Sequence, residues 1–415
     1  MPRTHGPFQR IAVAVLRMTF AMLVSALLLF ATLQLQAQTF TVLHNFTGPE
    51  GDYPYAGLTM DRAGNLYGTA GNGGNTEGQC STSGCGTVFE LKHEGSGWIL
   101  DPLYAFSGPD GNSPQARVII GPDGNLYGTT TYGGTANAGT VFKLSPPPSA
   151  CKIALCPWRE TVLYSFQGGS DGEQPQSGDL LFDQQGDIYG TTPYGGTGSG
   201  CFANCGVVYK LTPSNGAWTE SVLYRFQGGN DGAFPFAGLI FDTAGNLYGT
   251  AEFGGTGFYG VVYKLSPSES GWTESVIYAF GDDPSQPYGG LISDQSGNLY
   301  GVTSTMTTEN TVVYELTPTD GAWSYQQLYS FPAYVGSVAK LTMDAAGRLY
   351  GTILLGGPEV FQLTFSNGQW TQTGFTGSAG DYPFGSVVLD ASGNVYSTAN
   401  QGGTFDKGVV FEITP

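Results

Sequence analysis

Two families of glycine-rich loops carry the side chains that could bind a ligand. In the first an aspartate lies in or beside a glycine-containing turn, and in the second an aromatic residue precedes a Gly-Gly pair. The ligand-binding candidates are Asp110, Asp171, Asp231, Asp283, Asp381, Tyr132, Tyr194 and Phe253. Carboxylates hold cations, and rings with a polar neighbourhood suit a polar polymer such as a glycan. The alternative is that Asp-Gly is only a turn dipeptide here.

Cofactor chemistry beyond these carboxylates has little support in the sequence. No glycine-rich loop leads into a helical segment with Lys and Ser or Thr, so no phosphate cradle is expected. We expect no cofactor, with Ca²⁺ at the loop aspartates left open. No catalytic or metal-binding residue is assigned.

Catalysis would need one site that differs from its neighbours. Two segments break the loop pattern, 303–310 and 332–336, but neither combines a nucleophile with a base. Beyond the N-terminal segment the histidines are His44 and His93, which gives a Ser-His or Cys-His arrangement little basis. Paired carboxylates could still cleave a polysaccharide. The sequence therefore favours a binding or scaffold protein, with a polysaccharide hydrolase or lyase as the alternative.

The cysteines form three local pairs. They are Cys80 with Cys85, Cys151 with Cys156, and Cys201 with Cys205. In an exported chain such pairs favour disulfides that staple loops, and no histidine stands near any of them to complete a zinc site.

An aromatic motif that returns seven times sets the framework for these loops. Its tyrosines, spaced by 60, 62, 59, 52, 50 and 46 residues, are Tyr67, Tyr127, Tyr189, Tyr248, Tyr300, Tyr350 and Tyr396. The spacing is close to that of propeller blades with four strands, which repeat every ~40 to 50 residues. In six of the seven repeats an Asp-x-x-Gly hairpin precedes the tyrosine, a Val-rich strand follows in every repeat, and a strand that begins at or near Trp comes fourth in six copies. We predict an all-β, seven-bladed β-propeller with four-stranded blades.

The last repeat ends at Pro415 with only three strands, whereas residues 39–46 match the end of a fourth strand and have no repeat of their own. We therefore predict that this N-terminal strand completes the last blade. Such closure leaves the ring without a long open edge.

The first 37 residues differ from the rest. Three arginines are followed by an uncharged apolar run from Met18 to Leu35 and by Gln36-Ala37-Gln38. This predicts a signal peptide over 1–37 and a propeller over 38–415, with an uncleaved anchor as the alternative. Cleavage changes the net charge from -18 to -21 because three arginines leave. We therefore expect an exported, acidic monomer. After cleavage it would not contact the membrane, and its negative charge would oppose binding to nucleic acid.

The combination of Leu-Tyr-x-Phe, Asp-Gly-x-x-Pro, Gly-Asn-Leu-Tyr-Gly-Thr-Thr, Gly-Gly and Val-Phe-x-Leu over residues 39–415 resembles the GloVer tandem repeats of exported bacterial proteins. Single motifs also resemble NHL-type propeller repeats. The resemblance implies a bacterial protein that is secreted, periplasmic or on the cell surface. It implies no catalytic residues, and the expected partner is a polymer, a glycan or a protein.

Overall fold

The computed structural model describes residues 38–95, 97–148, 157–281, 286–303, 311–331, 339–354, 360–375, 377 and 380–414. Nearly all of them belong to one compact unit, Phe40–Thr414. The predicted signal peptide, residues 1–37, lies outside the described residues. In the described part of the chain no helix is long and apolar enough to cross a membrane.

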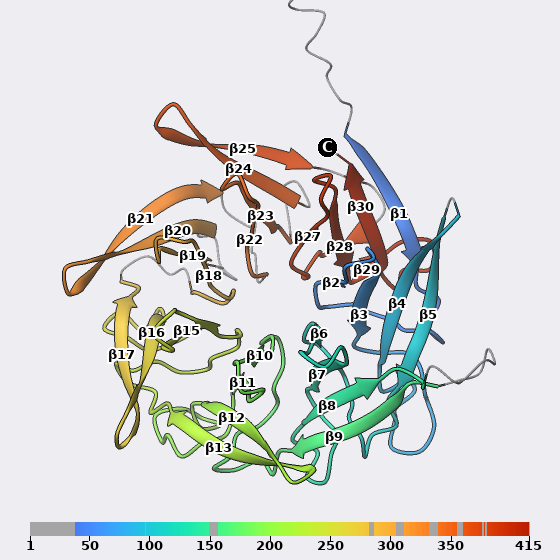
Figure 1. Cartoon of the computed structure of the whole chain (residues 1–415), viewed down its shortest axis with the longest axis horizontal. Coiled ribbons are helices and arrows are strands. Elements are labelled where there is room, and N and C mark those ends of the chain that lie inside the picture. Colours follow the sequence, from blue (N-terminus) through green and yellow to red (C-terminus); the bar gives the residue numbers. More distant parts are fainter. Residues whose placement is uncertain are drawn as a thin grey trace, which may run out of the picture. The chain divides into compact units, whose positions relative to one another are not determined.

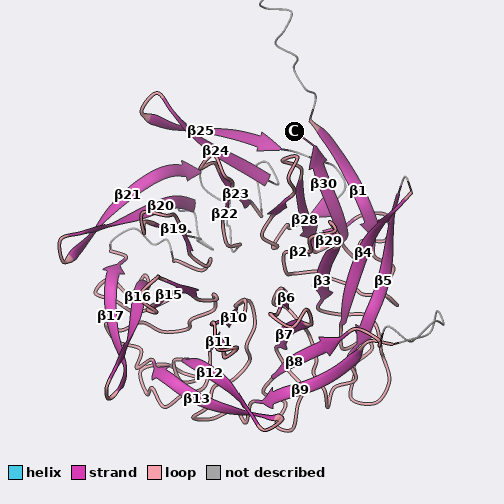
Figure 2. Ribbon diagram, viewed as in Figure 1, coloured by secondary structure: helices cyan, strands magenta, loops and turns pink. Residues whose placement is uncertain are grey.

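Within these residues the unit is a seven-bladed β-propeller, as the repeat predicts. Seven four-stranded antiparallel sheets lie around a common centre (Figure 1), and the ribbon consists of strands and loops (Figure 2). In the first six blades the strands follow one another from the centre outwards, for example β2-β3-β4-β5. The position of a residue in its repeat therefore fixes its distance from the centre of the ring.

The two inner strands of each blade flank the predicted hairpin. The innermost strands are β2 (Thr59–Met60), β6 (Ile119–Ile120), β10 (Leu181–Phe182), β14 (Ile240–Phe241), β18 (Ile292–Ser293), β22 (Thr342–Met343) and β27 (Val388–Leu389). The second strands are β3 (Leu66–Ala70), β7 (Leu126–Thr130), β11 (Ile188–Thr192), β15 (Leu247–Ala251), β19 (Leu299–Val302), β23 (Leu349–Thr352) and β28 (Val395–Ala399). Every residue of the second strands is buried, because both faces of a blade are covered by neighbouring blades.

The two outer strands are longer, and the third is mostly buried whereas the fourth is largely exposed or half buried. The third strands are β4 (Thr87–Glu94), β8 (Thr140–Ser145), β12 (Val207–Ser214), β16 (Val261–Ser268), β20 (Thr311–Thr319), β24 (Val360–Ser366) and β30 (Val409–Thr414). The fourth strands are β5 (Gly97–Ala105), β9 (Arg159–Ser165), β13 (Ala217–Arg225), β17 (Gly271–Ala279), β21 (Ala322–Phe331), β25 (Gln369–Phe375) and β1 (Thr39–Asn45). A short extra pair joins β26 (Gly380–Asp381) to β29 (Gln401–Gly402).

The N-terminal strand completes the last blade, which confirms the predicted closure. The order of that sheet is β1-β30-β28-β27, so chain segments more than 350 residues apart form one blade (Figure 1). Phe40 stacks on Phe411 with ring centroids 4.9 Å apart, and the Phe46 amide donates to the Gly408 carbonyl at 3.1 Å. The Lys407 ammonium lies 2.6 Å from the Asp52 carboxylate. Closure therefore rests on ring stacking, backbone bonding and an ion pair.

The seven repeated tyrosines have a structural role. Each phenol donates to the aspartate of the hairpin that precedes it, at O–O distances from 2.8 to 3.3 Å. In the second blade the turn is Gly121-Pro122-Asp123-Gly124, which has no aspartate at its first residue. Asp123, the third residue of the turn, accepts the bond from the tyrosine instead. The tyrosine thus ties its blade's inner hairpin to the second strand.

Aromatic pairs join neighbouring blades. The Phe at the end of one fourth strand packs edge-on or tilted against an aromatic residue in the third strand of the next blade, with centroids 4.8 to 5.3 Å apart. The pairs are Phe46–Phe89, Phe106–Phe142, Phe166–Tyr209, Phe226–Tyr263, Phe280–Tyr314 and Phe331–Phe361. Contacts of this kind add about 0.5 to 1.5 kcal/mol to the burial of the rings.

Candidate functional site

The two loop families predicted to carry ligand-binding residues lie side by side. In five blades the described residues show that the loop leading into the blade pairs its backbone with the loop between the second and third strands of that blade. Asn112 and Tyr132 exchange two N–H···O bonds of 2.9 Å, and Ala233 pairs with Phe253 in the same way. Asp110 and Tyr132 are therefore brought into adjacent loops, as are Asp231 and Phe253.

Three of the candidate aspartates are bound internally by their own loops. Asp110 accepts from the Tyr104 phenol at 2.6 Å and from the Ser107 amide at 2.8 Å. Asp171 and Asp231 repeat the arrangement with a tyrosine and a backbone amide. Hydrogen bonds inside the loop already use these carboxylates, so their main role in the structure is to fix the turn.

The structure corrects the position of another candidate, Asp381. It stands two residues later in its repeat than Asp110 does, and its backbone pairs with Gln401 at the place where Asn112 pairs with Tyr132. Sequence spacing placed it wrongly because both positions flank the same glycine. The carboxylate that matches Asp110 in the loop before the first blade is Glu50, which accepts from the Thr47 amide at 2.7 Å. Asp283 lies outside the described residues.

The aromatic candidates line an exposed rim. Tyr132 and Phe253 keep 37% and 38% of their surface exposed, whereas Tyr194 is half buried. Phe234 packs between Tyr194 and Phe253, with centroids 5.6 and 5.8 Å away. Phe234 has a φ of +58°, a conformation that a non-glycine residue rarely adopts, and the surrounding loop bonds must hold it there.

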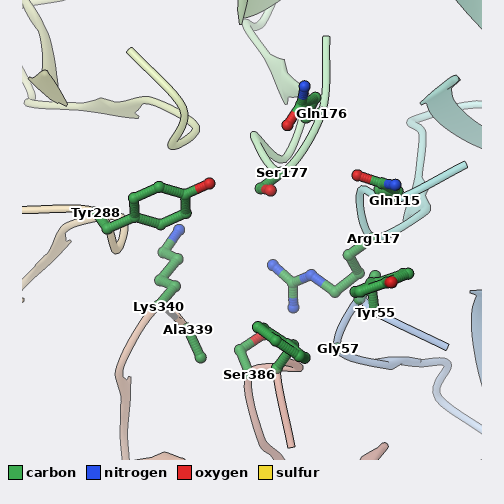
Figure 3. A pocket seen from close by; sticks show the side chains of 12 residues that line it. Tyr55, Gly57, Gln115, Arg117, Gln176, Ser177, Tyr288, Ala339, Lys340 and Ser386 are labelled. Carbon is green, nitrogen blue, oxygen red and sulfur yellow. The ribbon is translucent and has the colours of Figure 1, made fainter. Parts of the chain in front are cut away.

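A cavity of about 210 Å³ lies where the segments that lead into the innermost strands converge. Its walls come from six blades (Figure 3). They are lined by Tyr55, Ala56, Gly57, Gln115, Arg117, Gln176, Ser177, Tyr288, Ala339, Lys340, Phe384 and Ser386. None of the eight ligand-binding candidates is among them. The seven candidates that the structure describes lie in the loops that precede or flank these segments.

One position in each repeat lies next to the centre of the ring. It directly precedes a buried Leu or Val and the innermost strand, and its occupants are Gly57, Arg117, Asp179, Gly238, Gly290, Lys340 and Ser386. Neighbouring positions nearly touch, because a Cβ on Gly57 would lie 2.4 Å from Ser386 Oγ and one on Gly238 would lie 2.6 Å from the Asp179 carbonyl. Four small residues and three charged ones therefore share a narrow ring.

The three charged residues make this position differ between repeats, and a comparison of the loops alone did not reveal this difference. Arg117 donates to Asp179 at 2.5 Å, and its Nε is buried without a partner among the described residues. The Lys340 side chain extends into the cavity beside the Tyr288 ring, and the Arg117 guanidinium points into the same space from the opposite side (Figure 3). Burial is the main cause that lowers the pKa of Lys340, and Arg117 lowers it further while Asp179 opposes the change. Aligning the repeats on the buried Leu or Val would have revealed this position from sequence.

A fourth titratable side chain stands close to this sector. Glu252 immediately precedes Phe253, and burial raises its pKa to about 7. Its charge also contributes to the raised pKa of Tyr288 and of Tyr194, which places the carboxyl near both rings. Acid-base groups near neutrality cluster at functional sites, although burial in a structural network has the same effect.

Three further glutamates face the loop aspartates from the fourth strands. Glu160, Glu220 and Glu274 each have a buried oxygen without a partner in the described structure. Burial, and then the charges of Asp110, Asp171 and Asp231 in turn, raise their pKa to about 7. The folded protein therefore binds more protons than the unfolded chain between pH 4.5 and 7, and stability must fall as pH rises through that window.

We expect replacement of all three glutamates by Gln to make stability less dependent on pH, because Gln carries no charge. The fold accepts Gln at this position, since Gln372 is the equivalent residue of the sixth blade. After allowance for solvent screening, the gain in the free energy of unfolding at pH 8 should be about 1 kcal/mol per site. Denaturant unfolding at pH 5 and pH 8 measures it. A wild-type protein that is equally stable at both values would contradict the assignment.

Two of the predicted disulfides are present. Cys80 is bonded to Cys85 in the loop between β3 and β4, and Cys201 to Cys205 in the loop between β11 and β12. Both staple loops of the second family, as predicted. Cys151 and Cys156 lie outside the described residues. In the described part of the chain no group of three or more His, Cys, Asp or Glu side chains is placed to hold a metal ion.

Family and fold comparisons agree with this architecture. The family model described as Gloeobacter/Verrucomicrobia repeat matches residues 29–158 and 152–359. The chain belongs to this repeat family. Membership confirms the resemblance that the motifs indicate. No curated protein matches the chain by sequence.

Solved structures share the fold of this repeat protein at low identity. A chain of a mitotic checkpoint complex has a TM-score of 0.57 at 11% identity, over 91% of this chain and 93% of its own. A fungal alcohol oxidase of the AA5 family in complex with copper has a TM-score of 0.53 at 16% identity, covering 91% and 76%. A putative 6-phosphogluconolactonase from Bacteroides uniformis has a TM-score of 0.52 at 15% identity, covering 84% and 99%. Because these functions differ and identities are low, the likeness shows the fold alone.

Proposed function

We propose that this repeat protein is an exported, non-catalytic binding module that holds a glycan or related polar polymer at the mouth of its central channel. The aromatic path from the rim into the cavity carries the proposal. Phe253 packs on Phe234, Phe234 on Tyr194, Tyr194 on Phe236 and Phe236 on Tyr288, with centroids 4.8 to 6.0 Å apart. The path begins at an exposed ring and ends in a wall of the cavity.

The chemistry of this path suits a saccharide better than a bare cation. Sugar rings offer C–H faces to aromatic side chains and hydroxyl groups to polar ones, and Gln115, Gln176, Ser177 and Ser386 supply amides and hydroxyls in the cavity. A cation at the loop aspartates would have to displace internal hydrogen bonds. Ca²⁺ binding at these loops, left open by the sequence, is the weaker proposal and would appear as a calcium-dependent rise in melting temperature.

Export is part of the proposal. The two disulfides favour an oxidising compartment, and residues 1–37 have the pattern of a signal peptide. The acidic charge opposes binding to nucleic acid and to anionic lipid. A secreted, periplasmic or cell-surface monomer, free of the membrane once the signal is cleaved, fits these features, with a glycan, another polymer or a protein as partner.

A panel of immobilised polysaccharides, assayed for both retention and cleavage, tests the binding role. We expect retention of the protein without cleavage, and a roughly two- to tenfold loss of affinity in Tyr288→Ala and Phe253→Ala, since each loses one stacking ring. Phe365→Ala is the matched control, because Phe365 is an exposed ring on β24, in the outer part of its blade. Equal retention of all variants would contradict a binding path through Phe253 and Tyr288.

A polysaccharide-cleaving enzyme is the second candidate, and one observation favours it. Arg117, Lys340, Tyr288 and Glu252 gather charge and acid-base groups in one sector, whereas a scaffold would distribute them evenly over the blades. Glu252, with its pKa raised to about 7, is the candidate general acid or base. Cleavage of a panel member that Glu252→Gln abolishes while retention persists would replace the binding proposal with the enzyme.

A further inference from the structure

The inner ring has an excess of positive charge on an otherwise acidic protein. Arg117 and Lys340 outnumber Asp179, the one acid among the seven ring positions, and Asp179 is already paired with Arg117. The whole chain has a formal charge of -18. Positive charge inside a narrow opening of an acidic protein makes the local electrostatic potential positive and focuses it in the opening.

Among the residues that the structure describes, the Lys340 ammonium is not paired with a carboxylate. No hydrogen bond or ion pair of its ammonium lies among the described residues, and the nearby Tyr288 ring, Arg117 and Asp179 are the groups that face it, with Glu252 beyond Tyr288. The Lys340 side chain is half buried, and an unpaired cation that is partly removed from water is stabilised when an anion binds beside it. Arg117 has the same need, since its buried Nε is unsatisfied.

From this geometry we propose that the cavity is a site for one anionic group, a carboxylate or phosphate carried on a saccharide-sized ligand, seated between Arg117 and Lys340. The inference rests on the proposed function and specifies its ligand class. Arg117 would donate through the part of its guanidinium that Asp179 does not engage, and Lys340 would supply a point charge. Gln115, Gln176 and Ser386 would receive the hydroxyl groups of the same ligand.

The size of the cavity restricts the ligand. About 210 Å³ accommodates one sugar ring with its acidic substituent, and the rest of a longer polymer would lie outside the cavity. A uronate unit at the end of an acidic polysaccharide, or a sugar phosphate, has the required charge and dimensions. Neutral sugars lack the group that would satisfy the two cations.

Anion binding should be linked to proton uptake. Burial lowers the pKa of Lys340 in the empty site, and an anion beside the ammonium would raise it again. Binding would therefore be accompanied by proton uptake wherever the free protein has begun to lose this proton. Affinity should fall as pH rises through the range in which bound Lys340 deprotonates.

Isothermal titration with galacturonate, galactose, galactose 6-phosphate and inorganic phosphate tests the site. We expect the two acidic sugars to bind about tenfold or more tightly than galactose. Proton uptake on binding, measured in buffers of different ionisation enthalpy, should increase as pH approaches the pKa of Lys340 in the free protein. Inorganic phosphate separates the free anion from the sugar-borne one and should bind more weakly than galactose 6-phosphate. Equal affinity for galactose and galacturonate, or no binding of either acidic sugar at about 10 mM, overturns the proposal.

Lys340→Met is the decisive variant because it keeps the aliphatic volume and removes the charge. Preference for acidic over neutral sugar should be lost, while melting temperature stays at or above the wild-type value, because a half-buried, unpaired cation is gone. Lys264→Met is the matched control. Lys264 is on β16, its ammonium lies over the Tyr248 ring, and it does not line the cavity. If Lys340→Met retains the preference, the anion site is wrong even where the polysaccharide panel still shows retention. Loss of retention across the panel instead contradicts the proposed function.

Discussion

Deleting residues 39–46 is expected to destabilise the whole ring and not merely to trim its N-terminus. The last blade would lose its outer strand and expose the edge of β30, and Phe89 would lose the ring of Phe46, which is fully buried. Phe46→Ala alone should lower the free energy of unfolding by about 3 to 5 kcal/mol, the usual cost of truncating a buried Phe. Denaturant unfolding, monitored by tryptophan fluorescence, measures both variants.

Two controls separate ring closure from a general sensitivity to mutation. Phe405→Ala removes a ring that is 54% exposed near the same blade junction and should change stability by less than about 0.5 kcal/mol. A synthetic peptide of residues 38–47, added to the deletion variant, should restore part of the lost stability by mass action. If the deletion variant unfolds at the same denaturant concentration as the wild type, the strand does not hold the ring closed.

The second large effect concerns the hairpin aspartates. Asp242 accepts from the amides of Ala244 and Asn246, from the Asn246 side chain and from the Tyr248 phenol. Asp242→Ala leaves these donors without their acceptor and should lower the free energy of unfolding by roughly 1 to 3 kcal/mol. Asp320→Ala is the control, because Asp320 lies in an exposed outer hairpin.

Combining the change in three blades sharpens the test. Asp242, Asp294 and Asp390 serve separate blades and share no partners, so their losses should add within about 0.5 kcal/mol per pair. A triple variant no less stable than Asp242→Ala would show that the turns are held by other contacts. The expected readout is a lower midpoint denaturant concentration, with an unchanged dependence of the free energy of unfolding on denaturant concentration.

The same turns predict sensitivity to acid. Burial alone would raise the pKa of Asp123, but hydrogen bonds from Lys143, Tyr127 and Asn125 outweigh it and lower that pKa to about 2. The pKa of Asp242 is lowered in the same sense. This contribution to stability is present above the unfolded pKa near 3.8 and is lost as pH falls towards 2.

Sequence periodicity predicted the fold because each blade uses the same local rules. The repeated tyrosine, the Asp-x-x-Gly turn and the unpaired segment 39–46 together imply seven blades and their closure, and the structure confirms both. Local spacing also predicted Cys80–Cys85 and Cys201–Cys205, because loop disulfides join near neighbours.

The candidate site was less accessible to sequence reasoning. Asp-Gly dipeptides drew attention as possible ligand groups, yet Asp110, Asp171 and Asp231 are engaged in fixing their own turns. Arg117, Asp179 and Lys340 lie 62 and 161 residues apart along the chain and meet only because the ring brings equivalent positions to one centre. The difference in charge between repeats is not in the loops that the sequence drew attention to. It lies two residues before each innermost strand.

A crystal structure of the protein soaked with galacturonate tests the central claim most directly. The account predicts one sugar in the cavity, with its carboxylate within hydrogen-bond distance of Arg117 and Lys340 and its ring near Tyr288. Ligand density elsewhere on the blades with this cavity unoccupied, at a concentration that saturates binding in solution, would contradict it.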